Sequence, residues 1–367
     1  MTNNQYIRNS DTGKGKRIIK IILRVLAVIL AFILFLAATL VLTVKMILGD
    51  TSPKAKEILT TTLLETGQLK FVVSLFLDSE EVQKIVDKNS MEEFSDAVDS
   101  NLITISGNDS PGSNTSTAEQ GKDVEVFEIP GRTFTGYMIK IKDPSRVSLA
   151  TIYPWRDEGV TLDVLVNDNE ALGGINGGIY NSYNNSGGAP MGVVVSHGEI
   201  QMNNPNGDRG YVLIGLTEDN ILEIFSIEGM SPAEMENTIR EKKIRDAVTF
   251  QEESSDSNNH FVQLIINGKE RGLNGAGSGL NPRTAIGQCA DGSILMLVTD
   301  GRGKSGHLGA SASDLIDIML EYGAVNAANL DGGSSSCMYY DHEWLMTSVT
   351  FYYTNSSWKL PFAFIVK

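Results

Sequence analysis

Cysteine and basic residues are scarce in this sequence of 367 residues. The 2 cysteines, Cys289 and Cys337, form no Cys-x-x-Cys spacing, which argues against a cysteine-based zinc site. They could pair as a disulfide outside the cytoplasm or stay as buried apolar thiols, and the sequence leaves both alternatives open. Lysine and arginine total 30 against 45 aspartates and glutamates, which gives a net charge of −15. Nucleic acid is therefore not expected as a partner, because its phosphates require basic clusters.

Histidine is also rare, with 4 residues and no His-x-x-x-His spacing. We interpret His307, in the short loop GRGKSGH, as a residue that lines this loop rather than as an acid or base. No motif requires a cofactor. The alternative is an oxygen-rich Ca²⁺ or Mg²⁺ site assembled from Asp300, Asp331 and Asp341, which spacing alone does not reveal.

One apolar run, Val25–Val44, carries no charge and at roughly 20 residues is long enough to cross a bilayer as a helix. Basic residues dominate the segment before it: Arg8, Lys14, Lys16, Arg17, Lys20 and Arg24. By the positive-inside rule we predict a cytoplasmic tail over 1–24 and a single transmembrane helix over 25–48. The rest of the chain is then expected outside the cell membrane. The alternative is a cleaved signal peptide, for which the apolar run is long.

The remaining chain divides by composition. Apolar residues at helical spacing predict a helical stalk over 49–105, or else helices packed on the following domain. Residues 106–120 (SGNDSPGSNTSTAEQ) have the composition of a flexible linker. Over 121–367 short β-like runs predominate, with helical patterns at 231–245 and 311–322. We expect an α+β domain in which helices pack on a mixed sheet. The expected strands are 124–129, 136–141, 146–153, 191–195, 211–216, 221–227, 261–266, 294–299 and 362–366.

Four strings in this domain combine glycine with polar residues beside apolar runs. They are GGINGGIY from Gly173, NPRTAIG from Asn281, VTDGRG from Val298 and NLDGGSSS from Asn329. Asp300 and Asp331 each follow an apolar stretch and precede glycine, which places them at strand ends facing a cleft. Two such carboxylates can supply the acid and base, or the nucleophile, of glycoside hydrolysis.

Polar groups that could bind a substrate surround these aspartates in the sequence. Arg283 and Arg302 are candidate phosphate clamps, since a guanidinium can pair with two oxygens. The Asp-Gly-Gly-Ser string, with Ser334, offers backbone N–H groups and hydroxyls to an anion. The Asn176 amide suits sugar hydroxyls. A common Asp-Gly turn and surface ion pairs are the plain alternatives, and the co-occurrence of four such strings favours a site.

In their order along the chain, INGGIY, NPRTAIG, VTDGR and LDGGSSS resemble the motifs of the phosphodiester glycosidase family over about residues 124–367. The resemblance implies cleavage of the bond between the anomeric carbon of a sugar and a phosphate that esterifies a second group. By the matching motifs it implies the following site residues: Asn176, Arg283, Thr284, Asp300, Arg302, Asp331 and Ser334. The loop 181–188 (NSYNNSGG) is rich in asparagine and serine, so the sugar need not be N-acetylglucosamine.

The sequence therefore predicts a membrane-anchored glycosidase outside the cytoplasm that acts on glycosyl-1-phosphodiesters of cell-surface glycans or exopolysaccharides. We expect Asp331 to act on the sugar, Asp300 to position water or the arginines, and Arg283 and Arg302 to hold the phosphate. The expected partners are a carbohydrate phosphodiester and, through one helix, a lipid bilayer. A binding module for phosphate-bearing glycans, without catalysis, is the rival hypothesis, and an assembly factor acting through 51–100 is a third.

Overall fold

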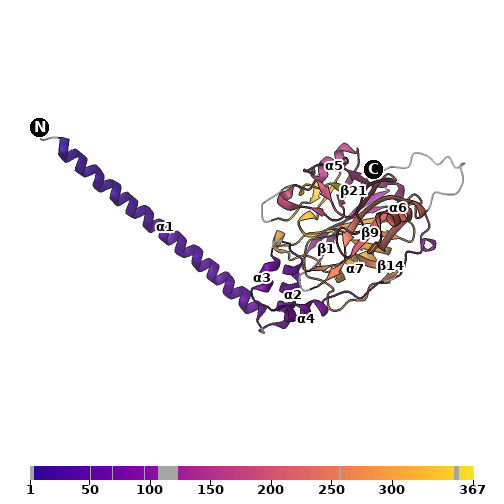
Figure 1. Ribbon diagram of the computed structural model, residues 1–367, viewed down its shortest axis with the longest axis horizontal. Helices are drawn as coiled ribbons and strands as arrows, with labels where there is room; N and C mark the ends of the chain where they lie inside the picture. The colour runs from indigo at the N-terminus through magenta and orange to yellow at the C-terminus, as the bar shows by residue number, and fades with distance from the viewer. Residues whose placement is uncertain are drawn as a thin grey trace. The chain divides into compact units, whose positions relative to one another are not determined.

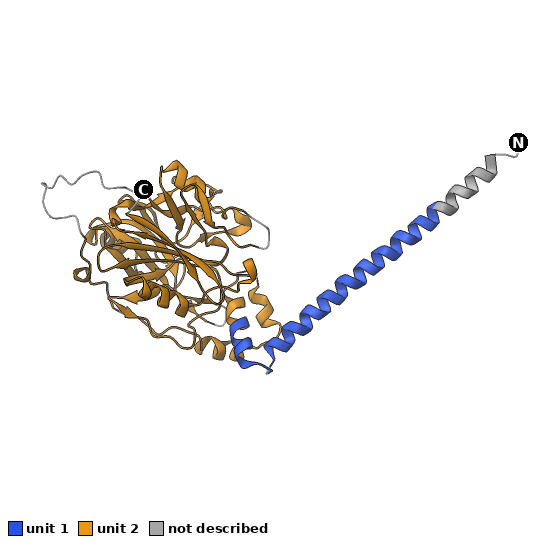
Figure 2. Ribbon diagram, turned by 180° about the vertical axis from the view of Figure 1, so that it is seen from behind, with its two compact units in different colours: residues 1–59 blue, residues 60–367 orange. Residues whose placement is uncertain are grey.

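The computed structural model describes residues 4–49, 51–67, 69–94, 96–105, 123–255, 258–350 and 355–367, with backbone alone over 4–14. It divides into two compact units, residues 1–59 and 60–367 (Figure 2). The predicted linker 106–120 lies outside the described residues. The predicted domain boundaries stay predictions.

The first unit is dominated by α1, Asn4–Leu48, the long helix of Figure 1. Its stretch Gly15–Leu48, of 34 residues, is the one described helix that is long and apolar enough to cross a membrane. Its most apolar part is not buried inside the protein, as expected for a helix in a lipid bilayer and equally for a signal sequence. The helix continues through part of the predicted tail rather than starting at residue 25.

The helical segment after α1 contains α2 (Pro53–Leu64), α3 (Lys70–Ser74) and α4 (Ser79–Asp87). Ser52 and Pro53 begin α2 as their types predict: the Ser52 hydroxyl accepts from the Ala55 backbone N–H at 3.4 Å. From Thr60 onward the segment belongs to the same compact unit as the β-rich domain. Buried apolar side chains of α3 and α4 (Val73, Val82, Ile85 and Val86) and a Met91–Leu273 bridge fix it there. Of the two alternatives stated above, packing on the domain describes residues 60–105.

The second unit contains three main sheets among its described residues. The seven-stranded sheet has the order β1 (Val124–Pro130), β2 (Thr135–Ile141), β17 (Ile294–Thr299), β16 (Arg283–Cys289), β18 (Ala324–Asn329), β14 (Gln263–Ile266) and β15 (Lys269–Glu270). One five-stranded sheet has the order β10 (Leu222–Ser226), β9 (Tyr211–Thr217), β11 (Ile244–Gln251), β7 (Val193–Ser196) and β8 (Glu199–Asn203). The other has the order β20 (Glu343–Met346), β19 (Met338–Tyr340), β4 (Gly173–Asn176), β21 (Phe362–Val366) and β3 (Val147–Thr151).

Short ribbons and helices complete the unit. The ribbons are β5 (Tyr180–Asn181) with β6 (Ala189–Pro190), and β12 (Glu253–Ser254) with β13 (Asn259–His260). The α-helices are α5 (Leu162–Asp168), α6 (Pro232–Glu241) and α7 (Ala312–Glu321). The 3₁₀ turns are Ser100–Leu102, Pro144–Arg146, Tyr183–Asn185, Lys304–Gly306 and Gly333–Ser335. Both α6 and α7 begin with a capping box, in which Ser231 or Ser311 exchanges hydrogen bonds with the third helical residue.

The fold is α+β, as predicted, but the sheets are not mixed: every described strand pair is antiparallel. Short connections explain this correction. Neighbours such as β16 and β17 follow each other through a tight turn at Asp291-Gly292, whereas a parallel pair requires a long crossover. The three sheets share one apolar core, to which each contributes side chains with no exposed surface, such as Ile286, Val248 and Phe364.

Most predicted strands are confirmed within a few residues. Ile294–Thr299 and Phe362–Val366 match at both ends. The helix predicted over 231–245 is shorter, because the chain leaves α6 at Lys242 and enters β11 at Ile244. Three strands that matter for the site, β4, β11 and β16, are missing from the expected strands, since glycine, alanine and polar residues interrupt their apolar pattern; of β18 only the end before Asp331 is expected.

Candidate functional site

Antiparallel order brings three of the four glycine-containing strings to one edge of the seven-stranded sheet. β16 starts at Arg283, and its neighbours β17 and β18 run the opposite way and end beside this start. In the register, Arg283 is opposite Thr299 and Ala285 is opposite Asn329. Asp300 directly follows β17 and Asp331 comes two residues after β18. The placement of both aspartates at strand ends is therefore confirmed.

A cavity of about 1090 Å³ opens at this edge. Four of the predicted residues line it, namely Arg283, Arg302, Asp331 and Ser334. Residues that the sequence did not assign to the site also line it, among them Glu65, Tyr180, His260, Asn281 and Ser335. A space of this size holds a ligand of several sugar or phosphate units.

Asp331 is the acidic group of this cavity whose proton affinity is most altered. Burial raises the pKa of its carboxyl to about 7, although hydrogen bonds from the Ser335 hydroxyl and the Gly332 N–H and the charge of Arg302 favour the ionised form. Ser335 in turn lies 3.0 Å from the Tyr180 hydroxyl, whose own pKa burial raises well above its usual value. A carboxyl that titrates near neutral pH in a cavity is suited to acid–base or nucleophilic work.

Arg302 supplies the positive charge beside Asp331. Its Nη1 donates to Ser334 Oγ at 2.9 Å and its Nε to Asn281 Oδ1 at 3.2 Å. Within the part of the chain that the structure describes, no carboxylate forms an ion pair with it. Burial, and then repulsion from Arg283, lower the pKa of Arg302 to about 10, so it stays charged at neutral pH. The guanidinium can thus meet an anionic ligand.

The backbone around Arg302 is unusual in a way that fits a functional position. Arg302 has a φ of 52°, in the left-handed region that residues other than glycine rarely adopt. Gly333 has φ of 62°, and a Cβ there would lie 2.5 Å from Arg302 Nη2. The positive φ favours glycine at 333, and the close approach shows that the Asp-Gly-Gly-Ser string lies directly against the guanidinium.

Arg283 also lines the cavity but is held by the protein. Its Nη2 forms an ion pair with Glu65 and donates to Gly279 O at 2.8 Å and Ser278 Oγ at 3.1 Å. Its Nε donates to Ala310 O at 3.2 Å, and its guanidinium lies 4.8 Å from the Phe261 ring centre. Arg283 is 6% exposed. Its charge is balanced and most of its donors are used, so it is a poorer phosphate clamp than Arg302.

Asn176 and Thr284 lie near the site but beneath its surface, each with no exposed area. Asn176 Nδ2 donates to the Asp331 carbonyl oxygen at 2.6 Å, while Thr284 Oγ1 donates to Asn176 Oδ1 at 2.8 Å. The Cys337 N–H reaches the same oxygen at 3.2 Å. These bonds hold the backbone of the Asp331 loop. Neither residue lines the cavity, and the predicted contact of Asn176 and Thr284 with substrate stays a prediction.

Asp300 does not line the cavity either, and its predicted catalytic role stays a prediction. Its carboxylate accepts from the Thr135 N–H at 2.7 Å and lies 2.8 Å from His307 Nδ1. Asp300 is 4% exposed. It fixes the loop that carries Arg302, and His307 contacts this carboxylate as well as lining the loop.

Among the residues that the sequence did not assign is His260, which lines the cavity. Burial, then the charges of Lys70 and Arg283, lower the pKa of His260 to about 4, so it is neutral at pH 7. Asn281 stands inside the quoted string NPRTAIG, which was a usable signal. Glu65 had no such signal, since it lies at the end of α2, far from the motifs in sequence.

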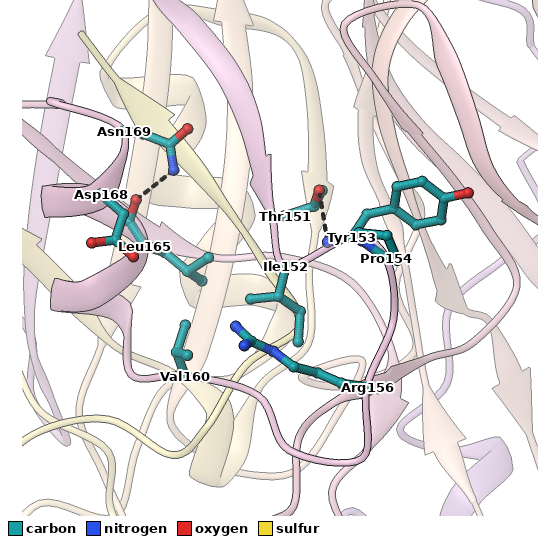
Figure 3. Close-up of a pocket in the computed structure, with 9 residues that line it drawn as sticks. All are labelled: Thr151, Ile152, Tyr153, Pro154, Arg156, Val160, Leu165, Asp168 and Asn169. Carbon is teal, nitrogen blue, oxygen red and sulfur yellow. Dashed lines mark hydrogen bonds between the residues drawn. The ribbon is translucent and has the colours of Figure 1, made fainter.

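A second hollow, of about 360 Å³, lies elsewhere in the unit (Figure 3). Its lining comes from the end of β3, the following loop and α5, and includes Tyr153, Arg156 and Asp168. None of the predicted site residues is among its lining residues.

Metal and disulfide predictions have different outcomes. Within the described residues, no three His, Cys, Asp or Glu side chains are placed to hold a metal ion together, so Asp300, Asp331 and Asp341 form no such site. Whether the protein uses a cofactor stays a prediction. Cys289 and Cys337 are both free and buried, which is the second of the two alternatives. Burial raises the pKa of both thiols, that of Cys289 to about 11.

A titratable carboxyl lies next to an arginine that has no ion-pair partner among the described residues, in a cavity at strand ends, which is a combination typical of an active site. The family model described as phosphodiester glycosidase matches residues 169–367, more than half of the chain. The chain belongs to the phosphodiester glycosidase family. The match begins at residue 169 rather than near 124, so β1, β2 and β3 lie outside it, as does Glu65.

Individual proteins resemble this chain at low sequence identity or over a short segment. The catalytic domain of zebrafish N-acetylglucosamine-1-phosphodiester alpha-N-acetylglucosaminidase, auto-inhibited by its pro-peptide, is 15% identical over 72% of this chain and 86% of that chain, with a TM-score of 0.52. This likeness shows the fold. A hypothetical protein from Synechocystis is 17% identical over 66% of this chain and 61% of its own, with a TM-score of 0.42. The SPbeta prophage-derived uncharacterized protein YomE of Bacillus subtilis (strain 168) is 43% identical over 56 residues, 15% of this chain and 8% of YomE.

Proposed function

We propose that this protein hydrolyses the bond between the anomeric carbon of a sugar and the phosphate of a glycosyl-1-phosphodiester. The observation that carries the proposal is the pairing of Asp331, whose pKa is about 7, with Arg302 in one cavity. The family to which the chain belongs supports the same reaction class.

Arg302 and Ser334 bind the phosphate in this proposal. Arg302 is the cavity's arginine without a carboxylate partner in the described residues, and Ser334 is already hydrogen-bonded to it. A phosphate that displaces Ser334 or joins it meets a planar donor group that can contact two oxygens at once. Arg283 contributes its charge to the cavity from a fixed position.

Asp331 acts on the sugar side. The leaving group is a phosphomonoester, which is a weak base, so its departure requires little help from an acid. The bond from the anomeric carbon to the phosphate oxygen breaks, and its electron pair leaves with the phosphate. The ionised Asp331 stabilises the positive charge that develops on the sugar, and it accepts a proton from the water that adds to the anomeric carbon.

The decisive assay is release of reducing sugar from defined glycosyl-1-phosphodiesters by the intact chain. Turnover that Asp331→Asn abolishes supports hydrolysis. Tight binding without release would instead favour the rival hypothesis, a binding module for phosphate-bearing glycans. Wild-type turnover in the variant would refute the role of Asp331 in the reaction. Running the assay with and without a chelator tests the metal prediction.

We further propose that α1 anchors the protein in the cell membrane, with the catalytic domain outside and glycans of the cell surface as substrates. The apolar run Val25–Val44 inside its membrane-length stretch Gly15–Leu48, and the basic residues that precede this run, support the arrangement. Protease added to intact cells should digest residues 60–367 and leave a membrane-bound fragment. Recovery of the domain as a free, shortened protein in the medium would indicate a cleaved signal sequence instead.

A further inference from the structure

The cavity contains a second carboxylate, Glu65, which comes from outside the segment that matches the family model. Glu65 follows the end of α2, and its side chain is 2% exposed. A buried carboxylate is costly unless it is paired and hydrogen-bonded. Its partners therefore indicate what it does.

Four groups surround this carboxylate. Oε2 forms an ion pair with Arg283 and accepts from Asn281 Nδ2 at 3.1 Å. Oε1 accepts from the Gly279 N–H at 2.8 Å and from Asn259 Nδ2 at 3.3 Å. Both oxygens are thus used by donors from the protein, and the loop that leads into β16 closes around them.

Asn281 connects Glu65 to Arg302. Its Nδ2 donates to Glu65, and its Oδ1 accepts from Arg302 Nε at 3.2 Å. Because a carboxylate only accepts and a guanidinium only donates, the amide between them has a single orientation that satisfies both. Arg302 Nη1 donates to Ser334 Oγ as well, so bonds at both Nε and Nη1 fix the orientation of the guanidinium at the cavity.

We infer that Glu65 is a positioning residue: through Asn281 it sets the orientation of Arg302, and directly it neutralises and fixes Arg283, so that one arginine remains to bind the phosphate. The inference rests on the proposed function. It gives a role in the site to a residue that lies before the segment matched by the family model and outside the four motifs. The alternative is a competing role, in which the Glu65 carboxylate occupies the position of the substrate phosphate and so competes with it for the arginines.

Glu65→Gln in the full chain separates the two roles, because the amide keeps the shape and one acceptor but loses the charge. A positioning role predicts that the dissociation constant of inorganic phosphate, measured by calorimetry, and the KM for a glycosyl-1-phosphodiester both rise about tenfold. kcat is expected to change less than KM. A competing role predicts the reverse sign, with tighter phosphate binding and lower KM, and that result would overturn the inference. So would unchanged values.

Two further variants guard against a mere folding defect. Glu252→Gln breaks the ion pair of Glu252 with the buried Arg271, neither of which lines the cavity, so it should lower the melting temperature and leave phosphate binding unchanged. Asn281→Ala interrupts the connection to Arg302 and removes one hydrogen bond to Glu65 while it keeps both members of the Glu65–Arg283 ion pair, and it should weaken phosphate binding about as much as Glu65→Gln. Wild-type phosphate affinity in Asn281→Ala contradicts the inference even if Glu65→Gln does not fold.

The inference and the proposed function fail in different ways. If the wild type binds phosphate but releases no sugar, and the variants lose phosphate, the positioning role stands and hydrolysis falls. If the wild type releases sugar and Glu65→Gln matches it in KM and phosphate affinity, only the positioning role falls. A wild type that neither binds inorganic phosphate at millimolar concentration nor releases sugar overturns both.

Discussion

The two sides of the cavity contain the same residue type with different surroundings. On one side, Arg283 is 6% exposed, paired with Glu65 and stacked on Phe261. On the other, Arg302 has a serine and an amide as partners and lies near Asp331, whose pKa is about 7. The partners, rather than the residue type, decide that Arg283 supports the site and Arg302 is available to a ligand.

The same lesson applies to the two aspartates. Both follow a strand and precede a glycine. The Asp300 carboxylate is hydrogen-bonded to the Thr135 N–H and to His307, whereas Asp331 lines the cavity. Substitutions on the two sides should therefore affect different quantities: activity on the side of Arg302 and Asp331, and stability on the side of Arg283.

The largest effect is expected at Asp331. Asp331→Asn removes the group that accepts the proton and stabilises the sugar cation, so kcat should fall by about 10³ or more. Inorganic phosphate should still bind with near wild-type affinity, since Arg302 and Ser334 are intact. Sugar release and calorimetry measure the two quantities, and a loss of both together would show that the variant damages the whole cavity.

Next in size is the effect of Arg283→Met on stability. Without its partner, the Glu65 carboxylate stays buried and unpaired, and the free energy of unfolding should fall by about 3–5 kcal/mol. Arg240→Ala is the control, because its pair with Glu236 is exposed on α6 and should contribute about 0–1 kcal/mol. Denaturant titration of the full chain, monitored by the unfolding of residues 60–367, measures the loss of stability in each variant. Equal losses in Arg283→Met and Arg240→Ala would contradict the difference between a buried and an exposed pair.

Arg302→Lys should change activity with little change in stability. Lysine keeps the charge but cannot contact two phosphate oxygens in one plane, so kcat/KM should fall by roughly 10- to 100-fold. The free energy of unfolding should fall by less than in Arg283→Met, because lysine keeps the charge beside Asp331 and no carboxylate in the described residues forms an ion pair with Arg302. If instead Arg302→Lys unfolds the domain and Arg283→Lys only slows catalysis, the two arginines have been assigned the wrong way round.

The smallest effect is that of pH near neutrality. Burial raises the pKa of Asp331 to about 7, so at lower pH the carboxyl is neutral and cannot accept a proton. kcat/KM should therefore rise with pH through about 7 and fall about tenfold per pH unit well below it. Raised pKa also means that ionisation of Asp331 destabilises the fold, so stability should decrease as pH rises from about 4 toward 7. A rate that falls through pH 7 would make Asp331 an acid.

Much of this arrangement follows from the sequence, and the reasons are local. Asp331, Arg302 and Ser334 stand in strings where glycine beside a polar residue marks a close approach, and the structure places all three at the cavity. The strands 294–299 and 362–366 were predictable because each is a short, nearly continuous apolar run.

What could not be predicted depends on contacts between distant residues. The strand β16 contains glycine, alanine and glutamine, so its β character comes from neighbours on both sides rather than from its own pattern. Nothing in the types of Asn176 and Thr284 says that they bond to each other below the surface instead of to a ligand. Glu65 joins the site only because α2 ends against the loop before β16, a pairing that spacing along the chain cannot express.

The most direct test of the account is to find which bond is broken when hydrolysis takes place in isotopically labelled water. Asp331 acting on the sugar side predicts that the labelled oxygen appears on the anomeric carbon and that the released phosphomonoester carries none. Label in the phosphate would mean attack at phosphorus, and it would contradict the assignment of Asp331 and the glycosidase reaction itself.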